Sequence, residues 1–589
     1  MRKSRPDAIS RGTKTKPAEA PSAQDGANRA QRETVESIVV AVILAFLFRA
    51  FVAEAFVIPT GSMAPTLQGR HMDVTCEMCG YNYRAGASGE NEGRSEVVAT
   101  NCPICRFTME LDKKGQPNQR SFNGDRILVS KFAYEIADPH RWDVIVFKYP
   151  GNAKQNYIKR LVGLPNETLW IFHGDIYTRS AGEGPQKFRI ARKPPDKLRS
   201  MMQVVDDTNY VAEELVRAGW PPRWQDWSAT QQKLDPAWRQ RAGGQGFETT
   251  GRSDQIAWLR YRHVPPRAAD WVEILKDGVL PRRLAKSDVQ GQLITDYYAY
   301  NDGVKEPPDF MDRYGKLALG MHWVGDLSLV ADAEVQGDSG QLWLDLVKGG
   351  VHYTCGIEVA TGNATLSIDG GQQSFVGEDG QPVLHPQART ALRGRGKYQL
   401  QFSNCDHELL LWVNNHLVTF EGPTTYQPAA NVKPKWSQAE PGDLEPLGIG
   451  AQGLSLSVSR LQVLRDEYYV AVTSRTPMKH EYEIPWEDDQ ILDVLTTPQD
   501  WNATPLFDSR RDNVYFELQS NQFFPMGDNS PQSKDGRLWS ETIQGGKLSP
   551  PPYVSRELLT GQALVIYWPH SWRAPIPFTP NLKRMGLIR

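Results

Sequence analysis

The stretch Tyr157-Ile-Lys-Arg-Leu-Val-Gly-Leu-Pro165 has the β-branched and apolar residues of a strand that ends at a Gly and a Pro. Successive side chains of a strand point to opposite faces, so Tyr157, Lys159 and Leu161 share one face. Lys159 is therefore expected among apolar neighbours, with Arg160 pointing away from them. Desolvation lowers the pKa of a lysine and leaves it neutral near ambient pH, as a general base must be.

Similar apolar runs precede this strand, and together they predict a mostly β protein. Arg126-Ile-Leu-Val129 and Val144-Ile-Val-Phe147 are bounded by Gly, Pro and Asp, as strands are. With 589 residues, of which 40% are hydrophobic, the chain is long enough for several domains. Its net charge of −2 gives no global basic excess, so we expect no nucleic-acid partner.

The N-terminal part of the chain predicts a membrane anchor behind a polar tail. Residues 1–33 are polar, lack aromatic residues and carry several Lys and Arg, which is typical of a disordered tail. Residues 34–57 would supply the roughly 20 mostly apolar residues of a spanning helix if Glu36 and Arg49 reach the two interfaces. The basic tail then lies in the cytoplasm. A buried helix of a soluble domain and a cleaved export signal are the alternatives.

A serine follows this segment in a Pro- and Gly-rich stretch, Ile58-Pro-Thr-Gly-Ser62-Met-Ala-Pro-Thr-Leu67. A serine hydroxyl is a poor nucleophile unless a neighbouring base takes its proton. Gly61 gives the backbone beside Ser62 conformational freedom. A second polar loop lies near the C-terminus, Met526-Gly-Asp-Asn-Ser-Pro-Gln-Ser533-Lys-Asp535-Gly-Arg537. Taken singly, each stretch also fits an ordinary turn.

In this order the motifs resemble the sequence boxes of bacterial type I signal peptidases, which are serine proteases with a Ser/Lys dyad. The stretch around Ser62 resembles the nucleophile box, and Asn123-Gly-Asp-Arg-Ile-Leu-Val-Ser-Lys131 resembles the next box. Arg141-Trp-Asp-Val-Ile-Val-Phe147 and the strand at 157–165 resemble the lysine box. The loop that starts at Met526 resembles the last one. The resemblance leaves two long insertions without an assignment.

The resemblance implies a role for each matching residue. Ser62 corresponds to the nucleophile and Lys159 to the general base. Thr60 stands where the family has a hydroxyl that joins the Ser62 backbone N–H in the oxyanion hole. Tyr157, on the same strand face as Lys159, is taken as a supporting residue.

The last box is implied to support the lysine. Ser533 matches a serine that hydrogen-bonds and orients the lysine, and Asp535 and Arg537 match a supporting pair. The sequence departs from the family here, because Ser530-Pro-Gln532 replaces the usual Arg-Asp-Asn. The geometry around Ser533 is therefore less well defined by the resemblance than the dyad.

Four of the six cysteines occur as two Cys-x-x-Cys pairs, formed by Cys76, Cys79, Cys102 and Cys105. Two such pairs suit a tetrahedral four-thiolate zinc site with each pair on a tight turn. The alternative is two disulfides, because this segment is expected outside the cytoplasm. We expect structural zinc and no cofactor for catalysis.

Residues 316–470 contain short apolar runs separated by Gly, Asn and Asp turns, and they predict an all-β unit. Leu410-Leu-Trp-Val-Asn-Asn-His-Leu-Val-Thr-Phe420 has the form of a hairpin that turns at its Asn pair. This pattern of short strands and turns is similar to that of concanavalin-like lectin or laminin-G-type sandwiches, so carbohydrate or another envelope component is a candidate partner. Cys355 and Cys405 lie in this unit and are candidates for a disulfide.

The expected fold is thus mostly β, with a single N-terminal transmembrane helix, a signal-peptidase-type β catalytic core, a zinc-ribbon-like insertion and a large insertion that contains a concanavalin-like β-sandwich. The expected segments are a tail at 1–33, the anchor at 34–57, the core at 58–72, 120–177 and 513–589, the zinc-ribbon-like insertion at 73–119, a segment of unassigned fold at 178–315, the sandwich at 316–470 and a connection at 471–512.

The expected function is removal of signal peptides, with small residues at positions −1 and −3, from exported preproteins. The expected location is the cytoplasmic membrane, with a single pass in contact with lipid and the catalytic domain on the outer side. Two rivals remain: a Ser/Lys protease of the self-cleaving repressor type, and a catalytically degenerate envelope- or carbohydrate-binding protein.

Overall fold

The structure is a computed structural model and is mostly β. It describes residues 23–47, 52–92, 96–227, 235–241, 246–252, 254–281, 284, 291–303, 320–377, 380–429, 431–474, 480–483, 486–539 and 550–589. The chain forms two compact units, Met1–Glu54 and Ala55–Arg589. The second unit holds every residue singled out above as part of a site.

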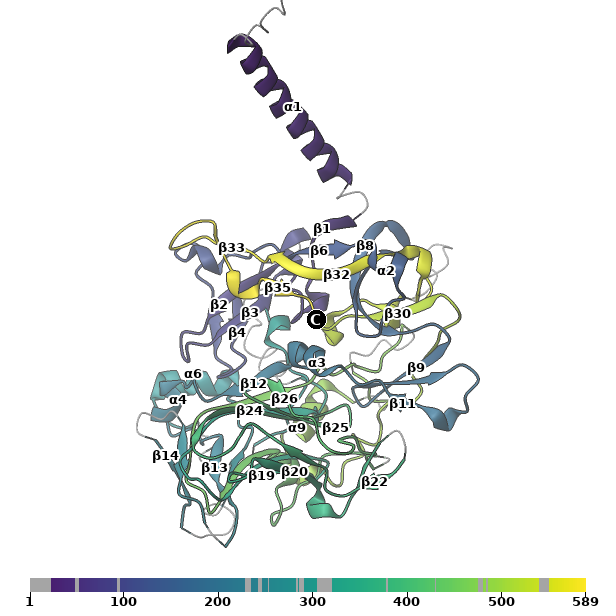
Figure 1. Cartoon of the computed structure of the whole chain (residues 1–589). Coiled ribbons are helices and arrows are strands. Elements are labelled where there is room, and N and C mark those ends of the chain that lie inside the picture. Colours follow the sequence, from purple (N-terminus) through teal and green to yellow (C-terminus); the bar gives the residue numbers. More distant parts are fainter. Residues whose placement is uncertain are drawn as a thin grey trace, which may run out of the picture. The chain divides into compact units, whose positions relative to one another are not determined.

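The expected transmembrane helix is not found. The N-terminal helix α1 runs over Ala23–Leu47, and the chain then forms strand β1 at Ala53–Val57 (Figure 1). Within the described residues, no helix has the length and apolar character that a membrane crossing requires. The reason is local: Arg32, Glu33 and Glu36 occupy the N-terminal half of α1, so its apolar stretch is much shorter than the roughly 20 residues that a span needs. The prediction of a spanning helix at 34–57 is therefore wrong.

The core of the second unit is an eight-stranded sheet built from distant parts of the sequence. In spatial order its strands are β1 (Ala53–Val57), β6 (Arg126–Ser130), β32 (Leu559–Trp568), β7 (Val144–Tyr149), β8 (Asn152–Gly163), β30 (Gln522–Met526) and β31 (Val554–Ser555), with β35 (Gly586–Leu587) beside β32. Figure 1 shows the C-terminal strand β32, in yellow, beside the early strand β6.

Strand β8 is central to this sheet, and its C-terminal half is buried on both faces. It pairs with β7 on one side, with Lys159 opposite Ile145, and with β30 on the other, with Arg160 opposite Met526. Lys159 and Arg160 therefore both enter the interior, on opposite faces of the sheet. The sequence predicted that Arg160 points away from Lys159; the structure adds that its side chain is fully buried.

A smaller, four-stranded sheet is formed by strands that lie between β8 and β30 in the sequence. Its strands, in spatial order, are β11 (Arg189–Ile190), β10 (Asp175–Ser180), β9 (Glu167–Phe172) and β29 (Tyr515–Glu517). One face contributes Leu169, Ile171 and Ile176 to a buried cluster. The other face carries the aromatic rings of Trp170, Phe172 and Tyr177.

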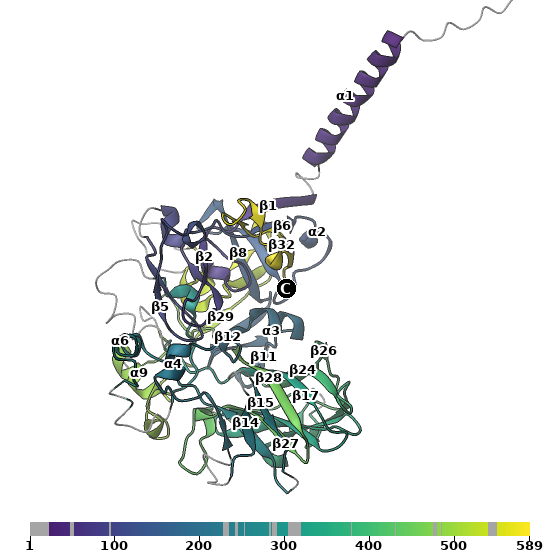
Figure 2. The same ribbon diagram turned by 90° about the vertical axis from the view of Figure 1, so that its left-hand side faces the viewer.

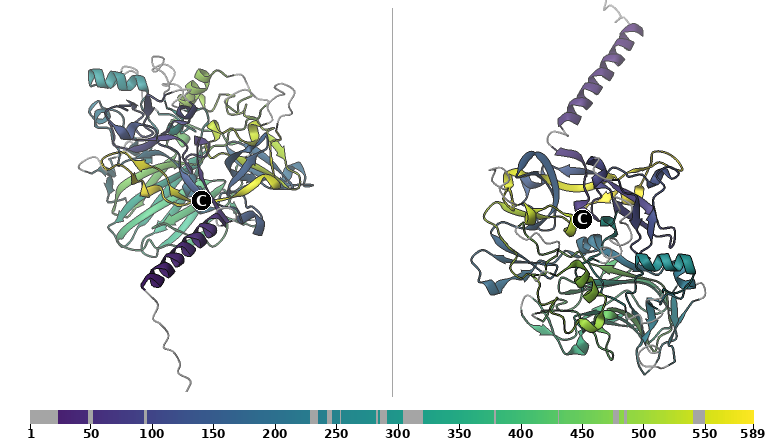
Figure 3. Two further views of the ribbon diagram at one scale, coloured as in Figure 1. Left: turned by 90° about the horizontal axis from the view of Figure 1, so that it is seen from above. Right: turned by 180° about the vertical axis from the view of Figure 1, so that it is seen from behind.

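The large insertion forms two further sheets, drawn in teal and green in Figures 2 and 3. The first contains β14 (Trp238–Gln240), β15 (Phe247–Thr249), β28 (Leu456–Arg465), β17 (Leu327–Val335), β24 (Gly396–Cys405), β25 (Glu408–Val413) and β26 (His416–Leu417), with β12 (Gln203–Asp207) beside β28. The second contains β13 (Trp224–Asp226), β16 (Ala257–Tyr261), β27 (Leu447–Gln452), β18 (Gln341–Lys348), β19 (Val351–Glu358), β20 (Asn363–Ile368) and β23 (Gln387–Arg389).

These two sheets share one hydrophobic core and so form a β-sandwich. Leu329 and Phe402 of the first sheet belong to the same buried cluster as Leu344 and Ile357 of the second. Strands β12–β16 come from residues 178–315, the segment to which the sequence assigned no fold. That segment extends both sheets of the sandwich.

The remaining elements are short. The α-helices of the second unit whose bounds fall within the described residues are α2 (Ala133–Ile136), α3 (Pro195–Met201), α4 (Glu213–Arg217), α6 (Ala268–Asp277) and α9 (Asp488–Leu495). The two-stranded ribbons pair β2 (His71–Thr75) with β3 (Asn82–Gly86), β4 (Ala99–Asn101) with β5 (Thr108–Glu110), β21 (Phe375–Val376) with β22 (Pro382–Val383), and β33 (Ser571–Trp572) with β34 (Thr579–Pro580).

A buried ion pair fastens β8 to the loop after β30. Arg160 Nε donates to Asp528 Oδ1 at 2.6 Å and Arg160 Nη2 donates to Asp528 Oδ2 at 2.7 Å, and both side chains are fully buried. This bidentate geometry is the strong form of the arginine–carboxylate pair. It joins residues that are 368 positions apart in the chain.

We predict that Arg160→Met lowers the free energy of unfolding by about 3–5 kcal/mol, because it leaves the buried Asp528 carboxylate unpaired. Urea unfolding measures the loss. The double variant Arg160→Met/Asp528→Leu should lose less, since no lone charge remains. Arg556→Met is the matched control, because Arg556 pairs with Asp138 at the surface, where such pairs contribute about 0–1 kcal/mol. Equal losses for Arg160→Met and Arg556→Met would contradict the prediction.

Candidate active site

Ser62 lies in a short 3₁₀ turn, Gly61–Met63, between β1 and β2, and its side chain is buried. The residues that follow, Met63 and Leu67, pack into the hydrophobic cluster of the core sheet. This packing anchors the Pro- and Gly-rich stretch to the core sheet. The Ser62 hydroxyl thereby faces β8.

Lys159 lies on β8 and is brought into contact with Ser62. Its Nζ is 2.6 Å from Ser62 Oγ and 3.0 Å from the carbonyl oxygen of Ile158, and its side chain is only 4% exposed. Burial lowers the pKa of Lys159 to about 8, against the opposing effect of the carboxylates of Asp535 and Asp528. A substantial fraction of the amine is therefore neutral at pH values just below 8.

The two nearby carboxylates are each engaged by an arginine. Asp528 pairs with Arg160, and Asp535 accepts from Arg537 Nη2 at 2.8 Å with both side chains fully buried. Burial alone would raise the pKa of Asp535, but Arg537 and the backbone N–H of Gly527 hold it below its usual value. Because these anions already have partners, Lys159 makes its contacts with the neutral oxygens of Ser62 and Ile158.

Ser533 is buried close to the dyad without bonding to Lys159. Its hydroxyl makes no hydrogen bond of ordinary geometry, although it is near enough to Asp535 to help keep the pKa of that carboxyl low. Gly527 lies between Ser533 and Ser62. A methyl group at Gly527 would come within 2.3 Å of both Ser533 Oγ and the Ser62 carbonyl oxygen, so only glycine fits there.

Thr60 and Tyr157 flank the dyad. Thr60 is exposed, has an extended backbone and does not cap the turn with its side chain, so its hydroxyl is available to a bound molecule. The Tyr157 ring centre is 5.6 Å from Lys159 Nζ, and the ring stacks on Tyr149 at 4.6 Å. Tyr157 thus adds an aromatic wall on the lysine's side of the sheet.

Asp528 and Asn529 are site residues to which the sequence gave no role. Asn529 donates from its backbone N–H to the carbonyl oxygen of Ser62 at 3.1 Å and from its side-chain amide to that of Gly61 at 3.0 Å. Their position in Met526-Gly-Asp-Asn was the available signal. The bonds themselves depend on a contact between residues 468 positions apart.

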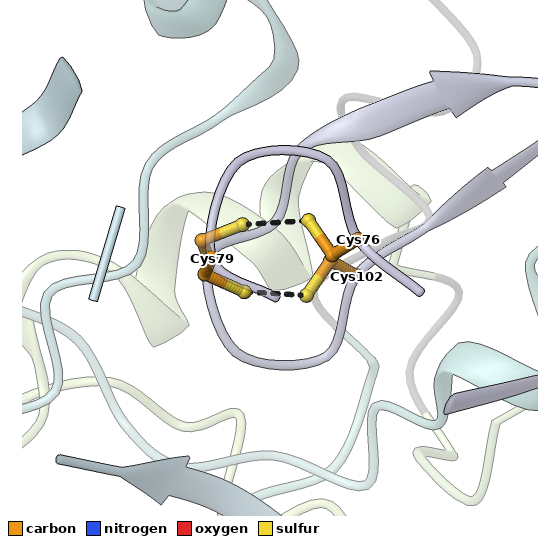
Figure 4. Close-up of side chains that lie close together, drawn as sticks. Cys76, Cys79 and Cys102 are labelled. Atoms are coloured by element: carbon orange, nitrogen blue, oxygen red, sulfur yellow. Dashed lines mark hydrogen bonds between the residues drawn. The ribbon is translucent and has the colours of Figure 1, made fainter. Parts of the chain in front are cut away.

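The four clustered cysteines come together on two similar turns (Figure 4). Cys76 and Cys79 lie on the turn between β2 and β3, and Cys102 and Cys105 on the turn between β4 and β5. All four are buried and free, and their sulfurs lie within 4.8 Å of one another. The Sγ–Sγ distances of 3.5 Å from Cys76 to Cys105 and from Cys79 to Cys102 are far longer than a disulfide bond of about 2.05 Å. The donor set fits a metal ion.

The remaining two cysteines are not joined. Cys355 and Cys405 are both buried and free, and they belong to different hydrophobic clusters. The candidate disulfide between them is absent.

Comparison with known proteins supports the family resemblance. Residues 31–91 and 107–214 match the family model described as signal peptidase, peptidase S26. Signal peptidase I of Pseudomonas aeruginosa is 50% identical over 58 residues, which are 8% of this chain and 20% of the relative. Signal peptidase I of Leptolyngbya laminosa is 26% identical over 189 residues, or 31% of this chain and 65% of the relative.

Among solved structures, the carbohydrate-binding module CBM66 of Bacillus subtilis aligns with 40% of this chain and 94% of its own, at 9% identity and a TM-score of 0.20. A galectin of Caenorhabditis elegans aligns with 24% of this chain at 10% identity and a TM-score of 0.16. Scores this low carry no argument about the sandwich.

Ser62 is in contact with the buried Lys159 of a central strand of the core sheet, and both residues fall within the segments matched by this family model. Over the matched residues the chain is similar to the signal peptidase family, which agrees with its resemblance to the bacterial type I enzymes. It spans about a fifth to two-thirds of the length of these relatives, and the matched residues leave most of the large insertion uncovered.

Proposed function

We propose that the protein is a signal peptidase that removes N-terminal signal peptides from exported preproteins, with Ser62 as the nucleophile and Lys159 as the general base. The observation that carries this proposal is the 2.6 Å contact between Ser62 Oγ and a buried amine that burial makes easy to deprotonate. A degenerate binding protein would have no use for a lysine held in this state. The preference for small residues at −1 and −3 is what the family resemblance implies.

In the proposed reaction the neutral Lys159 amine takes the proton of Ser62 as Oγ attacks the scissile carbonyl carbon. The negative charge that develops on the carbonyl oxygen is stabilised by donors such as the Thr60 hydroxyl and the Ser62 N–H, a contribution of about 3–4 kcal/mol for a single donor. Lys159 then gives the proton to the departing amine, which leaves an ester on Ser62. A water molecule deprotonated by Lys159 hydrolyses this ester.

We predict that Ser62→Ala and Lys159→Ala each lower kcat/KM for a signal-peptide substrate by at least about 10³-fold. Because the base must be unprotonated, wild-type kcat/KM should fall about tenfold per pH unit below the Lys159 pKa of about 8 and level off above it. Lys148→Ala, at an exposed lysine of the neighbouring strand, is the control and should keep both the rate and the pH profile. Normal cleavage by Ser62→Ala would exclude the mechanism.

We propose that the four clustered cysteines hold one structural zinc ion. Tetrahedral zinc with Zn–S bonds of about 2.3 Å places its sulfurs about 3.8 Å apart, close to the 3.5 Å separations found here. Each pair closes a similar turn, in which the N–H of Gly80 or Arg106 donates to the carbonyl oxygen of the first cysteine of that pair. The ion would join two ribbons that have little other regular structure.

We predict about one zinc per chain in the purified protein, measured by atomic emission, and its loss in Cys79→Ser. Because bound metal stabilises only the folded state, a chelator should lower the melting temperature of the wild type. Cys355→Ser replaces a buried free cysteine outside the cluster and should keep the metal. Wild-type protein that contains no metal, with its clustered thiols oxidised in pairs, would support the disulfide alternative instead.

A carbohydrate partner is a second, binding function that we propose for the sandwich side of the molecule. A cavity of about 1050 Å³ opens between the four-stranded sheet and the sandwich. Stacked rings form one wall, with Trp170 4.5 Å from Phe172 and 5.1 Å from Tyr177. Lys348 and Arg192 also line the cavity. Flat rings beside cationic groups suit the apolar faces and carboxylates of an acidic oligosaccharide.

We predict that hexagalacturonate binds the wild type more tightly than the neutral cellohexaose in calorimetric titrations, because Arg192 attracts its carboxylates, whereas Lys348 is already paired with Asp326. Trp170→Ala should weaken this binding at least tenfold. Phe132→Ala removes an exposed ring of the catalytic core and should leave it unchanged. Failure of the wild type to bind either oligosaccharide, or unchanged binding by Trp170→Ala, would count against this site.

A further inference from the structure

The backbone of Gly61 and Ser62 is held by groups that lie outside the core sheet. The carbonyl oxygens of both residues accept hydrogen bonds from Asn529, as described above. The N–H of Gly61 donates to Ser88 Oγ at 3.1 Å. Ser88 begins the short turn Ser88–Glu92, which lies in the cysteine-containing insertion. That insertion therefore contacts the nucleophile loop directly.

The large insertion reaches the same loop through Asn301. Its amide donates to Asn529 Oδ1 at 2.8 Å, and the Asn529 amide donates to Asn301 Oδ1 at 2.8 Å. The two hydrogens of the Asn529 amide are thus shared between Gly61 O and Asn301 Oδ1. Because this NH₂ group is planar, fixing one hydrogen bond also fixes the direction of the other. Asn301 therefore orients the side chain that holds Gly61.

Tyr300, the neighbour of Asn301, closes the other side of Gly61. Both residues belong to the short turn Ala299–Asn301. A methyl group added to Gly61 would lie 2.2 Å from Tyr300 Cε1, so the ring packs directly on the Gly61 α-carbon. The Tyr300 side chain is itself buried, with its hydroxyl 3.5 Å from the carbonyl oxygen of Arg70.

We propose that Asn301 and Tyr300 are positioning residues for the nucleophile, which makes the large insertion part of the catalytic centre. They touch neither Ser62 Oγ nor Lys159, and they act by fixing the backbone from which Ser62 Oγ approaches the lysine. Displacement of a reacting group by about 1 Å can cost on the order of 10²-fold in rate. This inference rests on the proposed peptidase function and adds to it a dependence on residues that lie outside the family's sequence boxes.

The first test is steady-state cleavage of a signal-peptide substrate by Asn301→Ala. We expect kcat to fall about 10- to 100-fold with KM changed less than about twofold, and the midpoint of the pH profile to stay in place because Lys159 is untouched. Asn301→Asp keeps an acceptor for the Asn529 amide and should recover part of the rate. Asn209→Ala changes an exposed asparagine of the same insertion and should match the wild type.

The second test uses the contact between Gly61 and Tyr300. Gly61→Ala should be nearly inactive because the new methyl group collides with the ring. Adding Tyr300→Ala to that variant makes room for the methyl group and should raise its kcat at least tenfold, although Tyr300→Ala alone lowers that of the wild type. Such a reversal would not follow from a merely structural role of Tyr300. Circular dichroism before each assay verifies that the variants are folded.

The outcomes separate the two proposals. A wild-type protein that cleaves no signal peptide would overturn the proposed function itself. If the wild type cleaves and a folded Asn301→Ala keeps its full kcat, only the positioning role is overturned. A double variant Gly61→Ala/Tyr300→Ala that stays as inactive as Gly61→Ala would likewise overturn the role of Tyr300.

Discussion

A buried lysine amine without a carboxylate partner is the constraint on which the site depends. A lysine in a protein interior normally either pairs with an anion or loses its proton. Asp528 and Asp535 are the carboxylates that raise the pKa of Lys159 most, and they form ion pairs with Arg160 and Arg537 instead. Lys159 is left with neutral oxygens, and its pKa falls to about 8. The two arginines thus leave Lys159 with the lowered pKa that the proposed role of a general base requires.

The Arg160–Asp528 ion pair also holds the core together across a long stretch of sequence. The loop after β30 is tied to β8 through Asp528 and to the nucleophile loop through Asn529. Between β8 and β30 the chain forms the four-stranded sheet and both sheets of the sandwich, and it then returns to complete the core. The insertion then contributes Tyr300 and Asn301 at the nucleophile loop. The large insertion is therefore in direct contact with the candidate active site.

Local patterns predicted some features well and others badly. The apolar runs around Val129, Val146 and Lys159 form β6, β7 and β8, because a run of β-branched and apolar residues between turn residues is a local signal for a strand. The apolar pattern at 34–57 led to the wrong prediction of a spanning helix, because an apolar stretch interrupted by charges does not specify the residue at which a helix ends. Among the described residues the helix covers Ala23–Leu47, and a strand begins at Ala53. Strands β12–β16 were missed because they enter the sandwich through partners beyond residue 320: β12 and β15 pair with β28, and β16 pairs with β27.

By itself the sequence predicted the mostly β class, the resemblance to signal peptidases and the candidate site residues, because order and spacing along the chain record these. It also indicated the metal site, since each Cys-x-x-Cys pair is a local turn. The tertiary structure alone decided which groups meet. The 2.6 Å contact of Lys159 with Ser62, the pairing of Asp528 with Arg160, and the hydrogen bonds between Asn301 and Asn529 all join residues far apart in the chain. Burial and electrostatics arise from packing between such segments, so no local pattern contains them.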